Sequence, residues 1–119
     1  MRNYRELIVW QKAHELTLAA YRLSQRFPGD ERFGLTCQLR DAMKSVPANI
    51  AEGCGRDSDR EFVRFLRIAA GSASEADYHL LLARDLGYLD EDAFNACTAT
   101  LDEVRRMLTA LIKRFRDSH

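Results

Sequence analysis

Residues 58–87, SDREFVRFLRIAAGSASEADYHLLLARDLG, predict one long amphipathic helix with a defined beginning and end. Ser58 and Glu61 have the spacing of a capping box, in which two side chains satisfy free amides at a helix start. Gly87 marks the other end. Apolar side chains recur between them at helical spacing: Phe62, Phe65, Leu66, Ala69, Ala73, Ala76, Leu80 and Ala83. The middle of the segment, residues 69–74, is unusually rich in small side chains, and we expect a neighbouring helix to approach closely there. Such packing would explain the presence of Gly71, which costs about 1 kcal/mol in helix propensity relative to alanine.

Three further segments with helical periodicity flank this one. They cover roughly residues 5–26, 31–53 and 90–116, and none shows the alternation typical of a strand. Asp90 is the expected N-cap of the last segment. The sequence therefore predicts a single domain over residues 1–119, an all-α, antiparallel up-down-up-down four-helix bundle.

Pro47 lies inside the second segment, where proline removes a backbone hydrogen bond and clashes with the carbonyl four residues earlier. The apolar stripe of this segment stays in register across Pro47. We therefore expect a continuous but kinked second helix. Gly53 and Gly55 are expected to end it in left-handed conformations.

The first segment has an apolar face that is wider than one core contact needs. Two neighbouring apolar stripes together span about 200° of the helix. A helix this broadly apolar is expected to contact the core and also a second subunit. The side chains assigned to that subunit interface are Val9, Ala13, Leu16 and Ala20.

The charge balance excludes two classes of protein. Eighteen Lys and Arg residues balance eighteen Asp and Glu residues, so the formal net charge is zero. A uniformly basic nucleic-acid-binding domain and an acidic disordered chain are both excluded. No run approaches the roughly 18 apolar residues that span a bilayer. The three widely spaced cysteines are typical of reduced thiols, which indicates a cytoplasmic protein.

No constellation points to an enzyme or to a cofactor. Glu75 and His79 are one helical turn apart and are interpreted as a surface ion pair, because a di-metal bundle needs Glu-x-x-His on two helices. Arg114 and His119 have the spacing found in helical ribonucleases of the HEPN class, but His119 is the last residue. We expect no metal, no cofactor and no catalytic residue.

Basic side chains form two groups that suit a phosphate backbone. Three arginines of the third segment fall within about 60° of each other around the helix. The candidate nucleic-acid-binding side chains are Arg40, Lys44, Arg56, Arg60, Arg64 and Arg67. Arginine presents a planar fork that engages phosphates. The alternative, a solvated helix face with ordinary ion pairs, stays open, and no exposed aromatic residues alternate with these arginines.

Three stretches carry a resemblance to a known family: LIVWQKA at 7–13, SVPANIAEG at 45–53 and AGSASE at 70–75. Together they resemble the bacterial four-helix-bundle family of 23S rRNA intervening-sequence proteins. That family is similar to the accessory variability protein of diversity-generating retroelements. The resemblance covers nearly the whole chain, and the central Asn-Ile-Ala-Glu-Gly stretch is its most specific part.

The resemblance implies a cytosolic, non-enzymatic four-helix bundle that assembles into a ring-like homopentamer. It also implies a connection with RNA or DNA, or with a nucleic-acid enzyme such as a reverse transcriptase. Asn49 and Glu52 are expected to tie the end of the second helix to the start of the third, around Arg56 and Ser58. The residues of the family pattern interpreted as structural are Pro47, Asn49, Glu52, Gly53, Ser58, Glu61 and Gly71.

Two functions remain open at this point. The first is an oligomeric helical protein that binds RNA or DNA through arginine-bearing surfaces. Because such a stripe would repeat around a ring, a neutral protomer could still present a basic surface. The second is a protein–protein scaffold or adaptor with no nucleic-acid contact.

Overall fold

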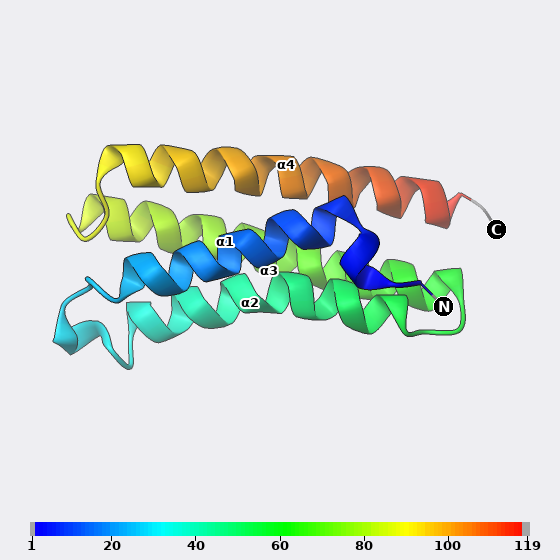
Figure 1. Cartoon of the computed structure of the whole chain (residues 1–119), viewed down its shortest axis with the longest axis horizontal. Helices are drawn as coiled ribbons and strands as arrows, with labels where there is room; N and C mark the ends of the chain where they lie inside the picture. The colour runs from blue at the N-terminus through cyan, green and yellow to red at the C-terminus, as the bar shows by residue number, and fades with distance from the viewer. Residues whose placement is uncertain (1, 118–119) are drawn as a thin grey trace.

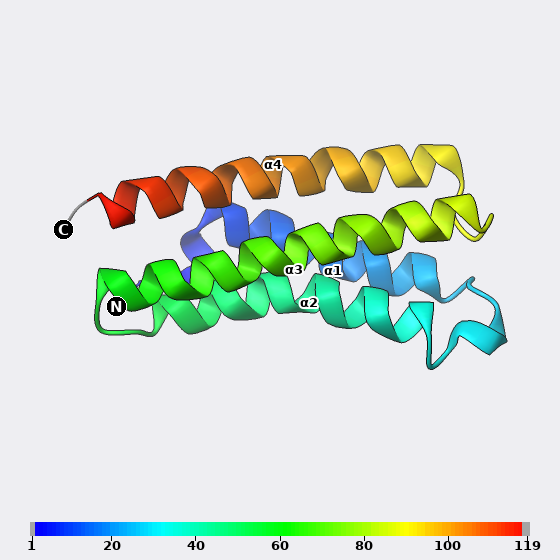
Figure 2. The ribbon, with the colours of Figure 1, turned by 180° about the vertical axis from the view of Figure 1, so that it is seen from behind.

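A computed structural model describes residues 2–117 and contains four helices arranged side by side (Figure 1). The helices are α1 (Ile8–Ser24), α2 (Leu35–Cys54), α3 (Asp59–Asp85) and α4 (Glu91–Arg116), with short 3-10 turns at Tyr4–Glu6 and Gly29–Glu31. Each helix packs against its neighbours in sequence, and α1 closes the bundle against α4. The opposite views of Figures 1 and 2 place α1 and α3 on opposite faces. The predicted all-α four-helix bundle is confirmed.

Side-chain caps start the last two helices where the sequence predicts them. The Ser58 Oγ accepts the Glu61 amide at 3.1 Å, and the Asp90 Oδ1 accepts the Ala93 amide at 2.8 Å. Only this half of the predicted capping box forms, because the Glu61 carboxylate binds Arg64 instead. These caps satisfy amides that would otherwise have no intrahelical partner.

Glu31 explains why α2 begins later than its sequence pattern indicates. Its Oε1 accepts the Leu35 amide at 3.1 Å, which caps the helix there. Its Oε2 accepts the Tyr88 hydroxyl at 3.0 Å and so connects this turn to the turn between α3 and α4. The hydrogen bond to this carboxylate raises the pKa of Tyr88, because ionisation would bring two negative charges together.

The predicted subunit-interface stripe on α1 lies in the core of the single chain. Its four members, Val9, Ala13, Leu16 and Ala20, are only 1–3% exposed. Their assignment to a second subunit is therefore corrected, because this stripe of α1 packs against the other helices of the same chain. The large apolar side chains that α1 exposes are Ile8 and Leu18, at 58% and 43%.

α2 runs without a break through Pro47, so the predicted continuity of this helix is confirmed. Pro47 lacks the amide that would bind the Met43 carbonyl. The Thr17 hydroxyl of α1 lies 3.3 Å from that carbonyl oxygen and 2.8 Å from the Ala13 carbonyl oxygen. A neighbouring helix thus supplies a donor near the acceptor that Pro47 leaves free.

Gly53 allows α2 and α3 to approach closely at one end of the bundle. A Cβ at this position would lie 2.9 Å from the Phe65 Cβ and 3.3 Å from the Phe62 carbonyl oxygen. The predicted left-handed ending is wrong: Gly53 is still helical, and Gly55 has a φ of −86°. The requirement at Gly53 is for space and not for a positive φ.

Gly71 has the opposite environment. It is exposed, and no atom lies within 4 Å of the position that a Cβ would occupy. Gly71 itself therefore faces away from the neighbouring helices, but the small residues beside it do allow a close approach: Ala69 and Ala73 are fully buried, and the Ser72 Oγ lies 2.8 Å from the Ser45 Oγ of α2. Gly87 has a φ of 80°, the one positive φ among residues 2–117, and it ends α3 as predicted.

Alanine at the two helical glycines is expected to act in opposite directions. Gly53→Ala should lower the free energy of unfolding by about 1–3 kcal/mol, because the methyl group overlaps the Phe65 side chain and the α3 backbone. Gly71→Ala should raise it by about 1 kcal/mol through helix propensity. Urea unfolding followed by circular dichroism measures both, and an equal effect of the two variants would contradict this account.

Candidate nucleic-acid interface

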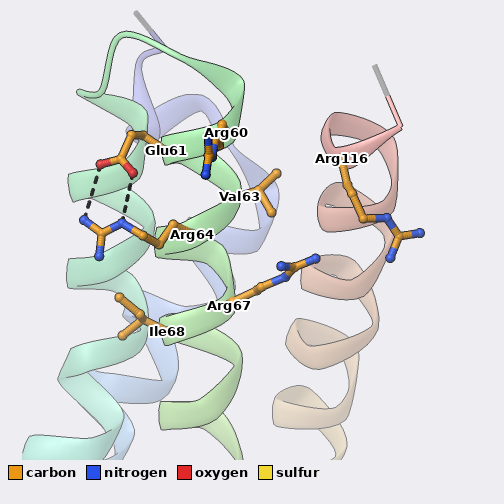
Figure 3. A pocket seen from close by; sticks show the side chains of 7 residues that line it. All are labelled: Arg60, Glu61, Val63, Arg64, Arg67, Ile68 and Arg116. Carbon is orange, nitrogen blue, oxygen red and sulfur yellow. Dashed lines mark hydrogen bonds and ion pairs between the residues drawn. The ribbon is translucent and has the colours of Figure 1, made fainter. Parts of the chain in front are cut away.

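A hollow of about 1130 Å³ lies on the surface between the first half of α3 and the end of α4 (Figure 3). We call it the arginine groove. Its lining residues are Arg60, Glu61, Val63, Arg64, Arg67, Ile68 and Arg116. Four of these seven residues are arginines, and one, Glu61, is acidic. An anionic partner is the ligand that such a charge pattern favours.

Arg60 and Arg67 carry the available positive charge of the arginine groove. Both side chains are exposed, and the described part of the chain contains no ion-pair partner for either. Figure 3 shows Arg67 extending from α3 toward α4. Their guanidinium groups are therefore free to bind an external anion.

Arg64 is held more firmly than its two neighbours on α3. Its Nε and Nη2 donate to the Glu61 carboxylate at 3.0 and 3.3 Å, and its guanidinium lies 4.5 Å from the centre of the Phe65 ring. The hydrogen bonds from Arg64 lower the pKa of Glu61 below its ordinary value. Arg64 is thus oriented by its partners, with part of its charge already neutralised.

Arg116 joins the groove from α4, and the sequence pattern did not assign it to the site. It pairs with Asp117 at 3.1 Å. Basic residues in the last turn of a helix interact favourably with the helix dipole, so their presence there does not by itself indicate a binding site. Which helix lies beside Arg116 depends on the tertiary arrangement.

Arg56 lies next to the arginine groove but does not line it. It pairs with Glu52 at 3.3 Å, and its guanidinium lies 4.8 Å from the centre of the Phe65 ring. Glu52 thus reaches the start of α3 through Arg56, in line with its predicted structural role. Arg56 belongs to the connection between α2 and α3.

Asn49 differs from its predicted contacts. Its Nδ2 donates to the Ser45 carbonyl and to the Ser45 Oγ, both at 2.8 Å. The Ser45 Oγ lies 2.8 Å from the Ser72 Oγ of α3. Asn49 therefore holds Ser45, the residue that contacts the middle of α3, and makes no hydrogen bond to the region of Arg56 and Ser58.

Arg40 and Lys44 do not form the exposed basic pair that their spacing predicts. Arg40 is half-buried and donates to the Ser24 Oγ at 2.7 Å and to the Tyr21 carbonyl at 3.1 Å. It ties α2 to the end of α1. Lys44 is exposed and lies 3.5 Å from Asp41. Arg40 is therefore corrected from a binding residue to a structural one.

His79 is buried, which corrects its interpretation as part of a surface ion pair. The residue is 7% exposed, its Nε2 lies 3.1 Å from Glu75, and its Nδ1 has no hydrogen-bond partner. No group of three His, Cys, Asp or Glu side chains within residues 2–117 is placed to hold a metal ion. His119 of the ribonuclease-like pair lies outside the described residues.

The three cysteines are free thiols. Cys37 is exposed, whereas Cys54 and Cys97 are buried, and burial raises the pKa of both buried thiols. The described helices include none with the length and apolar character needed to cross a bilayer.

The chain is similar to known proteins both in its sequence and in its fold. The family described as "23S rRNA-intervening sequence protein" matches residues 5–110. A crystal structure of a protein of unknown function of the S23 ribosomal protein family, from Bacteroides thetaiotaomicron, is similar with a TM-score of 0.83 and 24% identity. The match covers 89% of this chain and 99% of that chain. No curated protein matches the chain.

Substitutions at Arg40 and Lys44 test whether the Arg40 side chain contributes to the stability of the fold and the exposed Lys44 side chain does not. Arg40→Gln should lower the free energy of unfolding by about 1.5 kcal/mol or more, because it removes hydrogen bonds from a charged donor between two helices. Lys44→Gln, the matched control one turn away, should change it by less than about 0.5 kcal/mol. Urea unfolding provides the measurement, and equal stability of the two variants would show that Arg40 is not a structural tie.

Proposed function

Because the chain belongs to the family of 23S rRNA-intervening sequence proteins, we propose that it is a non-enzymatic, oligomeric protein that binds RNA or DNA through the arginine groove. The observation that carries this proposal is the pair of exposed arginines, Arg60 and Arg67, which have no ion-pair partner in the described chain. Phosphate contacts from such side chains supply most of the affinity of sequence-independent nucleic-acid binding.

The distribution of charge explains how a neutral chain could bind a polyanion. The first half of α3 and the end of α4 supply the arginines of the groove. The other halves of the same two helices carry acidic residues, among them Glu75, Asp77, Glu91 and Asp92. The two signs are therefore separated along the bundle, and the net charge of zero does not describe the local field.

The binding proposal predicts an affinity that depends on salt and on two arginines. Fluorescence anisotropy with a labelled, structured RNA should give micromolar or tighter binding at about 50 mM salt and weaker binding by tenfold or more at about 200 mM. Arg60→Gln/Arg67→Gln should weaken binding at low salt by about tenfold, because it removes two phosphate contacts.

Two exposed arginines, Arg22 in the last turn of α1 and Arg26 in the turn that follows, provide a matched control. Arg22→Gln/Arg26→Gln removes the same charge from a different surface and should leave the affinity within about twofold. Affinity no better than millimolar at low salt would overturn the proposal and favour a protein–protein adaptor. An equal loss in both double variants would assign the effect to total charge and not to the arginine groove.

We also propose that the chain acts as a homo-oligomer in the cytoplasm, with the pentamer that the family resemblance implies. Two exposed apolar side chains of α1, Ile8 and Leu18, support this assembly. Ile8 borders a second, more apolar hollow of about 450 Å³ between α1 and α4, which includes Met107 and Leu111. A surface of this kind favours association. The resemblance to the retroelement accessory protein adds a reverse transcriptase as a proposed partner.

The assembly proposal predicts a particle mass of about five times 13.7 kDa, measured by light scattering at micromolar concentration. Ile8→Glu should shift the mass toward one chain without loss of helical signal, because this side chain is 58% exposed. Leu86→Glu, at a 49% exposed position in the turn after α3, is the control. A single-chain mass for the unaltered protein would overturn the assembly.

A further inference from the structure

The geometry of the arginine groove points to a more specific ligand, and we propose that it binds the paired phosphate backbones of a nucleic-acid duplex. This inference rests on the proposed function and names the form of nucleic acid that the groove takes. A duplex offers two rows of phosphates, one on each side of a groove, whereas a single strand offers one row of phosphates and unstacked bases.

The aromatic rings near the groove are not available to stack on bases. Phe65 is 8% exposed, and the guanidinium groups of Arg56 and Arg64 lie 4.8 and 4.5 Å from its ring centre. Phe62 is fully buried, and Arg2 lies over its ring at 4.1 Å. Single-strand-binding proteins gain much of their affinity from bases stacked on exposed rings. The arginine groove lacks that element.

Tyr78 is the exposed aromatic residue of α3, but it lies away from the arginine groove. It is 57% exposed and stands about 16 Å from Arg67 along the helix, at 1.5 Å per residue. Its neighbours Glu75 and Asp77 are acidic and would repel a phosphate backbone. Tyr78 therefore does not extend the groove into a base-stacking site.

The basic residues form two rows, one on each helix. Arg105 of α4 donates to the Ser74 Oγ at 3.3 Å and lies 3.9 Å from Asp77, which fixes the antiparallel register of the two helices. This register brings Lys113 level with Arg67. The row on α3 consists of Arg60, Arg64 and Arg67, and the row on α4 consists of Arg116, which lines the groove, and of Lys113, an exposed neighbour that does not line it.

The two rows stand on neighbouring packed helices, and the usual distance between the axes of such helices is close to the width of a duplex groove. Packed helices lie about 8–10 Å apart, and the grooves of B-form DNA are about 6 to 12 Å wide. Arg60 and Arg67 are separated by about 10 Å along α3, the axial rise of about three nucleotides. One row can therefore follow each strand across a groove without contact to a base edge. Recognition of this kind is independent of sequence.

Direct comparison of double and single strands tests the inference. The probes are a labelled duplex of about 20 base pairs, as RNA and as DNA, and an unstructured oligothymidine of equal length, measured by anisotropy at several salt concentrations. The duplexes should bind at least tenfold more tightly than the single strand. A plot of the logarithm of their affinity against the logarithm of the salt concentration should have a slope of about −2.7 to −4.5, since three to five phosphates are neutralised.

Variants of each row separate this inference from the proposed function. Arg60→Gln/Arg67→Gln and Lys113→Gln/Arg116→Gln should each weaken duplex binding by about tenfold, whereas Arg22→Gln/Arg26→Gln should not. Equal affinity for duplex and single strand, lost in the Arg60→Gln/Arg67→Gln variant, would overturn the inference and leave the proposed function intact. Unchanged duplex affinity in Lys113→Gln/Arg116→Gln would also overturn it. Absence of binding to every probe would overturn both.

Discussion

The close approach of α2 and α3 at Gly53 is the constraint on which the remaining structure depends. A single methyl group at Gly53 would overlap Phe65 and crowd the Phe62 carbonyl, so only glycine allows this contact. The Ser45–Ser72 hydrogen bond holds the same two helices further along. Because this contact fixes the inner side of α3, it also fixes which side of α3 stays at the surface. Arg60 and Arg67 lie on that surface side.

A second set of contacts holds the start of α3 against the end of α4, the two segments that form the arginine groove. Arg2 binds Asp59 at 2.6 Å, and its guanidinium lies 4.1 and 4.6 Å from the ring centres of Phe62 and Phe115. The rings of Phe62 and Phe115 meet edge to face at 5.2 Å. Because both sides of the groove rest on this cluster, their spacing is set by packing and not by the charged residues, which would repel one another.

Residue patterns predicted features that depend on neighbours within one helix. The caps at Ser58 and Asp90 and the shared face of Arg60, Arg64 and Arg67 follow from spacing alone. Predictions that required knowledge of another helix were less successful. Gly71 and Arg40 show why. The sequence does not indicate whether a small residue such as Gly71, or a cation such as Arg40, faces solvent or a neighbouring helix.

Four helices, their order and their apolar stripes follow from the sequence alone, because helical periodicity and capping are local properties of the chain. The tertiary structure was needed to show which stripe of α1 faces the core and that Lys113 of α4 lies level with Arg67 of α3. Those outcomes depend on the rotation and register of each helix against its neighbours, which are set by side-chain packing over the whole bundle. The arginine groove exists only because two segments distant in sequence pack side by side.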